Sequence, residues 1–128
     1  MGEYNIEKLT SPCTYQGGKQ RVAKEIVDYI FKTTPIFHDT KFYDLCCGSG
    51  AMTIELLNRG ILPSQITMLD KSSWGVFWKS IGTGNFDYNK FLEYANKVPR
   101  DKSLIQSHIK DLSTKDANFD EEYKYLLI

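Results

Sequence analysis

The chain has 128 residues, which is enough for one domain with a hydrophobic core. Its 16 basic residues balance 16 acidic ones, so no overall charge draws it towards nucleic acid or a membrane surface, and any DNA contact needs a local patch. Three cysteines without a zinc-binding spacing, and the lack of an apolar run long enough for a membrane span, favour a reduced cytoplasmic protein with no membrane partner.

The first half of the chain alternates helical and strand patterns. Apolar residues recur at helical spacing over residues 22–30, and a predicted strand follows over 41–45. Residues 51–58 predict a second helix, and the β-branched, apolar segment 65–69 predicts a second strand. This order implies two parallel strands joined by a right-handed crossover, the core of a doubly wound α/β sheet.

The rest of the chain has helical patterns. Ser72 or Ser73 caps the first helix, whose aromatic stripe we interpret as core. That stripe and its apolar neighbour are Trp74, Phe77, Trp78 and Ile81. Further helices are predicted over 88–97 and 103–112, the second with Leu104, Ile105, His108, Ile109 and Leu112 inward, and Asp120 caps a last one. We therefore expect an α/β part over residues 1–84 and a helical segment over 85–128, within one compact unit.

A glycine turn follows the first predicted strand, in the segment Phe42-Tyr43-Asp44-Leu45-Cys46-Cys47-Gly48-Ser49-Gly50-Ala51. Glycine has no Cβ, so backbone and ligand approach closely at such a turn. Asp44 and Asp70 end the two predicted strands, at the edge where open parallel sheets bind ligands. A carboxylate at Asp70 would accept hydrogen bonds from ribose hydroxyls. The alternatives are that Asp70 caps the next helix and that Asp44 only stabilises the turn.

Two common nucleotide-binding fingerprints do not fit the turn or the upstream Gly-Gly-Lys. The dinucleotide fingerprint needs a third glycine three residues after Gly50, where Thr53 stands. A P-loop needs Ser or Thr after its Gly-Lys pair, but Gln20 follows Lys19, and Cys13 replaces its first glycine. A two-glycine turn with a ribose-binding acid suits a nucleoside without a pyrophosphate, and S-adenosylmethionine is the common one.

Three motifs in this order resemble the D12 class of DNA adenine-N6 methyltransferases, the Dam-like group. They are Tyr15-Gln16-Gly17-Gly18-Lys19, Asp44-Leu45-Cys46-Cys47-Gly48-Ser49-Gly50 and the strand that closes on Asp70. The likeness covers roughly residues 11–81. It implies a truncated, Rossmann-like S-adenosylmethionine-dependent methyltransferase fold with a helical C-terminal segment, of restriction-modification or phage type.

The resemblance also implies roles for individual residues. Tyr15 and Lys19 would contact the methionine end of the cofactor or the nearby target pocket, with Lys19 as the cation for the carboxylate. Asp70 would hold the ribose. Asp44 and the turn from Gly48 to Gly50 would line the methionine and sulfonium region. Without the family, Gly17-Gly18-Lys19 is only a flexible loop that enters a helix.

The catalytic motif of the family, Asp-Pro-Pro-Tyr, positions the target amine and stacks on a flipped adenine. This chain has prolines only at positions 12, 35, 63 and 99, so no two are adjacent and we predict no catalytic residue. Its Leu45-Cys46 pair also departs from the usual Pro-Phe. We expect an incomplete form, inactive alone, whose complete enzyme binds DNA. The small sheet favours a homodimer or a partner chain, and the alternative function is a non-catalytic α/β interaction module.

Overall fold

The computed structural model describes residues 8–13, 18–112 and 120–127. Its contacts divide the chain into two compact units, Met1–Lys71 and Ser72–Ile128. The helix after Ser72 therefore groups with the later helices, whereas the sequence analysis assigned it to the part that ends at residue 84. Among the described residues, no helix combines the length and the apolar character needed to cross a bilayer.

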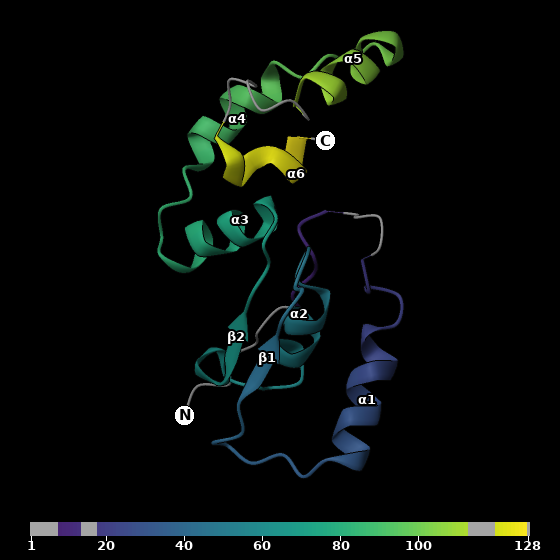
Figure 1. Ribbon diagram of the computed structural model, residues 1–128, viewed down its shortest axis with the longest axis vertical. Coiled ribbons are helices and arrows are strands. Elements are labelled where there is room, and N and C mark those ends of the chain that lie inside the picture. The colour runs from purple at the N-terminus through teal and green to yellow at the C-terminus, as the bar shows by residue number, and fades with distance from the viewer. Residues whose placement is uncertain (1–7, 14–17, 113–119, 128) are drawn as a thin grey trace. The chain divides into compact units, whose positions relative to one another are not determined.

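The first unit contains a small parallel sheet and two helices (Figure 1). In chain order its elements are α1 (Ala23–Thr33), β1 (Phe42–Asp44), α2 (Ala51–Asn58), the 3-10 turn η1 (Pro63–Gln65) and β2 (Ile66–Met68). The two strands run parallel, with Phe42 opposite Ile66 and Asp44 opposite Met68. The predicted parallel pair is confirmed, although each strand is shorter than predicted. The Rossmann-like methyltransferase fold stays a prediction.

A charged cluster joins the two helices of this unit. The Arg59 guanidinium, just after α2, donates to Glu55 over 2.8 Å and also to Asp28 of α1. It lies over the Phe31 ring, 5.8 Å from the ring centroid. The amide group of Asn58, at the end of α2, makes a reciprocal pair of hydrogen bonds with the Leu9 backbone. These contacts hold α1 and the backbone of Leu9 against the C-terminal end of α2.

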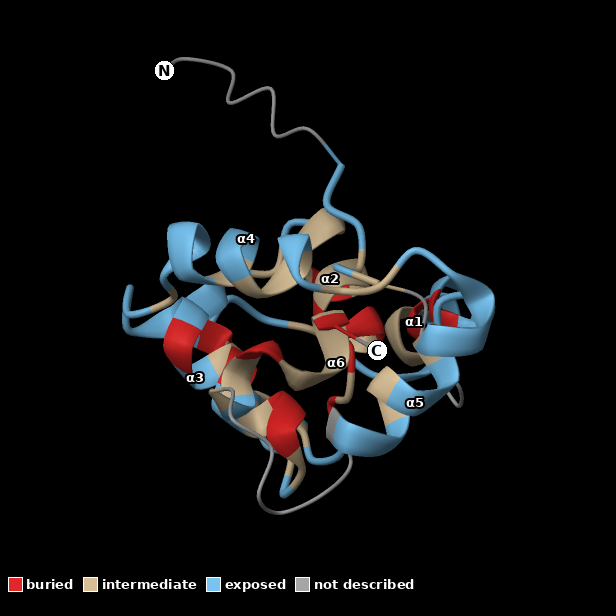
Figure 2. Ribbon diagram, turned by 90° about the horizontal axis from the view of Figure 1, so that it is seen from above, coloured by how far each residue is buried: buried red, intermediate tan, exposed pale blue. Residues whose placement is uncertain are grey.

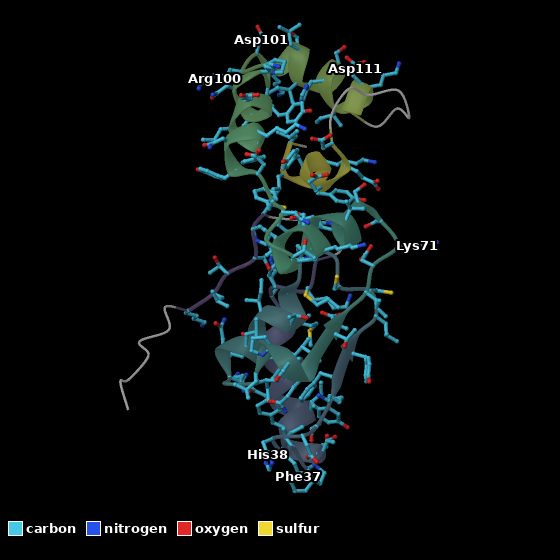
Figure 3. The ribbon with its side chains drawn as sticks, turned by 90° about the vertical axis from the view of Figure 1, so that its left-hand side faces the viewer. Phe37, His38, Lys71, Arg100, Asp101 and Asp111 are labelled. Atoms are coloured by element: carbon cyan, nitrogen blue, oxygen red, sulfur yellow. The ribbon has the colours of Figure 1, made fainter. Side chains whose placement is uncertain are left out.

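The second unit is helical (Figure 1). Its elements are α3 (Ser73–Gly82), α4 (Tyr88–Asn96), α5 (Lys102–Leu112), the 3-10 turn η2 (Glu121–Tyr123) and α6 (Lys124–Leu127). The Ser72 hydroxyl accepts from the Trp74 amide, so the predicted cap of α3 is confirmed. Asp87 caps α4 in the same way, and Asp101, labelled in Figure 3, accepts from the backbone and the hydroxyl of Ser103.

Aromatic side chains make up most of the core of the second unit. Figure 2 colours the buried residues red. Tyr123 and Leu127 are buried, and half-buried side chains pack around them: Phe86, Phe91, Tyr94, Ala95 and Val98. Trp74 and Phe77 are also buried, which confirms the core interpretation for these two members of the aromatic stripe, whereas Trp78 is half-buried. Stacking of the Trp74 and Tyr125 rings, at 5.0 Å between centroids, adds to this core.

Two expectations for the second unit are wrong. Leu104 is 56% exposed, because helical periodicity identifies one face of a helix but not how much of it a neighbour covers. Asp120 makes no capping hydrogen bond through its side chain; its carboxylate instead forms an ion pair with Lys90. Ile105, His108 and Ile109 of α5 are half-buried, and the side chain of Leu112 lies outside the described residues.

Candidate functional site

The turn between β1 and α2 depends on its two glycines. Gly48 and Gly50 have φ angles of 51° and 80°, in the left-handed region that strains any residue with a Cβ. The Gly50 amide donates to the Cys47 carbonyl over 2.8 Å, and α2 begins at the next residue. The predicted strand–glycine turn–helix junction is therefore present, and it exists because glycine occupies both positions.

Asp70 meets this turn at the carboxyl edge of the sheet. Its Oδ2 accepts a hydrogen bond from the Gly48 amide over 2.9 Å. The backbone supports that contact: Leu69 donates to the Asp44 carbonyl over 2.8 Å, and its own carbonyl accepts from the Cys47 amide over 3.0 Å. Two predicted site residues from different motifs, Asp70 and Gly48, are thus in direct contact.

A carboxylate offers about four acceptor positions on its two oxygens. The Gly48 amide binds to one of the two oxygens, Oδ2. The cap of α3 that the structure records is the Ser72 hydroxyl, which accepts from Trp74. The hydrogen bond from the Gly48 amide holds the Asp70 carboxylate beside the glycine turn.

Asp44 binds the start of α2 rather than lying open at the strand end. Its Oδ2 accepts from the Thr53 hydroxyl over 2.8 Å, and Thr53 is only 5% exposed. This is the arrangement that the turn-stabilising alternative predicts for Asp44. Its contact with a cofactor stays a prediction. The sequence analysis used Thr53 only to reject a dinucleotide fingerprint and missed its role in holding this carboxylate.

The upstream motif is described in part. Tyr15 and Gly17 lie outside the described residues, whereas Gly18 and Lys19 lie within them. The Lys19 carbonyl accepts from the amides of Val22 and Ala23, which starts α1, and its side chain is exposed. The structure therefore places the backbone of Lys19 at the beginning of a helix, and its contact with a ligand carboxylate stays a prediction.

Gln20 is a residue that the sequence analysis missed. Its Nε2 donates to the Cys13 carbonyl over 3.2 Å and to Ser49 Oγ over 3.3 Å. Ser49 stands between the two glycines of the turn and is 2% exposed. The only signal in the sequence was the position of Gln20, directly after Lys19, and nothing in the local pattern identified Ser49 as its partner.

The two carboxylates give this edge a negative electrostatic environment. The pKa of the Cys47 thiol is raised to about 12, mainly because the side chain is buried and further because Asp44 and Asp70 are nearby. The thiol therefore stays protonated and uncharged at neutral pH. Within residues 8–13, 18–112 and 120–127, no group of His, Cys, Asp and Glu side chains has the arrangement of a metal site.

Comparison of the chain with protein-family models, with curated proteins and with solved structures gave no match. The likeness to D12-class methyltransferases rests on the three sequence motifs alone.

Proposed function

We propose that the unit Met1–Lys71 binds S-adenosylmethionine at the carboxyl edge of β1 and β2, as the cofactor-binding part of a DNA adenine-N6 methyltransferase. The observation that carries the proposal is the 2.9 Å hydrogen bond between Asp70 Oδ2 and the Gly48 amide. It supports the proposal because it puts an acid suited to ribose hydroxyls beside a turn without side-chain bulk.

The charges of the site support this cofactor over other nucleosides. S-adenosylmethionine carries a sulfonium cation, which the nearby carboxylates of Asp44 and Asp70 favour electrostatically. Its methionine carboxylate needs a cation, for which Lys19 is our candidate. A dinucleotide is disfavoured, because Thr53 occupies the third glycine position and its hydroxyl is bound to Asp44.

In the complete enzyme that we propose, the N6 nitrogen of a flipped adenine attacks the sulfonium methyl carbon in line. The new N–C bond would form as the C–S bond breaks, S-adenosylhomocysteine would leave with a neutral thioether sulfur, and the amine would release its proton to solvent water. Positioning of the two reactants supplies most of the catalysis, since the sulfonium is already a good leaving group. The 128 residues contain no adjacent prolines, so we assign them cofactor binding and assign DNA methylation to an enzyme that also has the catalytic motif.

Calorimetric titration with S-adenosylmethionine tests the proposal. We expect the wild-type chain to bind and Asp70→Asn to bind about tenfold more weakly, since a charge-assisted hydrogen bond contributes roughly 1.5–3 kcal/mol. The asparagine oxygen still accepts from Gly48, so the turn is retained. The matched control is Asp39→Asn, an exposed carboxylate in the loop before β1. Absence of binding by the folded wild-type chain would overturn the proposal.

A second candidate function is protein interaction through the sheet. Tyr43 of β1 and the residues just after the two strands, Leu45 and Leu69, are 64%, 63% and 51% exposed. Parallel sheets normally have both faces covered, so these exposed apolar side chains favour a second copy or a partner chain. Sedimentation of the wild-type chain and of Leu45→Lys discriminates the two functions: self-association that the substitution abolishes, together with no cofactor binding, would favour the interaction module.

A further inference from the structure

One amide nitrogen connects three parts of the first unit. Gln20 Nε2 lies 3.2 Å from the Cys13 carbonyl oxygen and 3.3 Å from Ser49 Oγ. A primary amide nitrogen carries two hydrogens, so it donates both bonds at once. The Cys13 carbonyl only accepts hydrogen bonds, which fixes the orientation of the amide with its nitrogen, rather than its oxygen, towards Cys13.

Two of the three connected residues flank the upstream motif in the sequence, and the third lies in the glycine turn. Cys13 precedes the Tyr15–Lys19 motif, and Gln20 follows it directly. Ser49 is 2% exposed and stands between Gly48 and Gly50. The hydrogen bonds of Gln20 therefore hold both flanks of the motif against the part of the chain where we place the cofactor.

The Lys19 backbone has little freedom of its own. Its carbonyl accepts from Val22 over 3.1 Å and from Ala23 over 2.8 Å, so Lys19 is fixed to the start of α1. The Gln20–Ser49 contact adds a direct link between the residue after Lys19 and the glycine turn, beside the contacts of α1 with the end of α2. A change in that contact would move the lysine relative to the turn without removing either motif.

We propose that Gln20 is a positioning residue, which sets Lys19 at the distance from the Gly48–Gly50 turn that matches the carboxylate of S-adenosylmethionine. This inference rests on the proposed function and adds that the same site recognises the carboxylate of the ligand. Gln20 then controls affinity for the methionine carboxylate, while the adenosine part of the ligand is bound independently, through Asp70.

The test compares two ligands that differ by one carboxylate: S-adenosylmethionine and its decarboxylated form. Gln20→Met keeps the length of the side chain and removes both hydrogen-bond donors. Gln20→Glu keeps the shape of the side chain and replaces the donating amide nitrogen by a carboxylate oxygen, which only accepts hydrogen bonds. Since Gln20 is exposed, neither substitution removes core packing. We expect each to weaken S-adenosylmethionine binding about five- to tenfold and binding of the decarboxylated form less than about twofold. Gln106→Met, an exposed glutamine of α5, is the matched control and should change neither.

A double-mutant cycle with Ser49→Ala identifies the partner. If Gln20 acts through Ser49, the loss in Gln20→Met and the loss in Ser49→Ala will not add in the double variant. Equal weakening of both ligands in the Gln20 variants, or no weakening of either, overturns the positioning role while the proposed function stands. Failure of the wild-type chain to bind either ligand overturns the proposed function itself, and this inference with it.

Discussion

The Thr53 hydroxyl donates a hydrogen bond to Asp44 Oδ2 over 2.8 Å, and so joins the first turn of α2 to the last residue of β1. The two residues stand on either side of the turn that holds Gly48 and Gly50. Because Thr53 is only 5% exposed, water competes poorly for this bond. The contact closes the glycine turn and fixes the direction of the Asp44 carboxylate.

Thr53→Val should therefore destabilise the first unit, by about 1–2 kcal/mol, because it removes the donor to a carboxylate and keeps the volume of the side chain. Thr53→Ser keeps the hydroxyl and loses one methyl group, so we expect a smaller loss of about 0.5–1 kcal/mol. Urea denaturation of the three proteins measures both values. A valine variant as stable as the wild type would contradict this role of Thr53.

The glycine turn offers a second prediction. Alanine at Gly50, where φ is 80°, should cost about 1–2 kcal/mol of unfolding free energy and also weaken S-adenosylmethionine binding, because the new Cβ lies in the turn that the ligand approaches.

Gly60 is the matched control for that substitution. It has a φ of 92°, ends α2 away from the turn, and has nothing within 4 Å of the position of an added Cβ. Gly60→Ala should therefore show a similar loss of stability in urea denaturation and an unchanged dissociation constant in calorimetry. If both variants lost affinity equally, the weakening would come from stability alone and the turn would not be the binding site.

Cysteine reactivity reports on the electrostatics of the same turn. The thiolate is the form that reacts with alkylating reagents, and the pKa of Cys47 is about 12 through burial and the nearby Asp44 and Asp70. Cys46 is exposed. At about pH 8, iodoacetamide should modify Cys46 well before Cys47, and unfolding in urea should remove the difference.

Mass spectrometry of the modified peptides, with Cys46→Ser as the control, measures these rates. Loss of the fast modification in Cys46→Ser is the expected result, and fast modification of Cys47 in the folded protein would contradict the buried, carboxylate-lined environment described for it.

The ion pairs between α1 and α2 predict a pH dependence. The pKa of Asp28 is lowered by its hydrogen bond from Lys24 and then by that from Arg59. A carboxyl with a lowered pKa in the folded state contributes stability above its unfolded pKa, about 3.9, and this contribution is lost as the pH falls through the folded pKa. We expect the unfolding free energy of the wild type to be lower at about pH 3 than at about pH 6, and this decrease to be smaller in Asp28→Asn. An equal fall in both proteins would show that Asp28 does not contribute.

Local signals in the sequence were sufficient for the elements around the turn. Helix α2 begins at Ala51 and ends at Asn58, as predicted, because a glycine turn starts it and Gly60 follows it. The parallel strand pair was also predicted, but β1 and β2 are each one residue shorter at both ends than the predicted strands. A strand with a single partner has too few ladder hydrogen bonds to extend as far as its apolar pattern.

Contacts between distant residues could not be predicted in the same way. The sequence placed Asp70 and Gly48 at the same sheet edge, because parallel strands bring their carboxyl ends together, and they are in contact. It did not reveal that Gln20 reaches Ser49, 29 residues away, since no periodicity or motif relates the two. Side-chain partners of this kind depend on the packing of α1 against α2.

The amide resonances of the turn test the central claim most directly. In a titration of the ¹⁵N-labelled chain with S-adenosylmethionine, we predict saturable shifts for Gly48, Gly50 and Asp70, where the amide of Gly48 is bound to the carboxylate of Asp70. The amides of Gly60 and Gly84, which share the left-handed conformation but lie elsewhere in the chain, should not move. A well-dispersed spectrum in which the Gly48, Gly50 and Asp70 amides do not shift at saturating cofactor would contradict the proposed binding site.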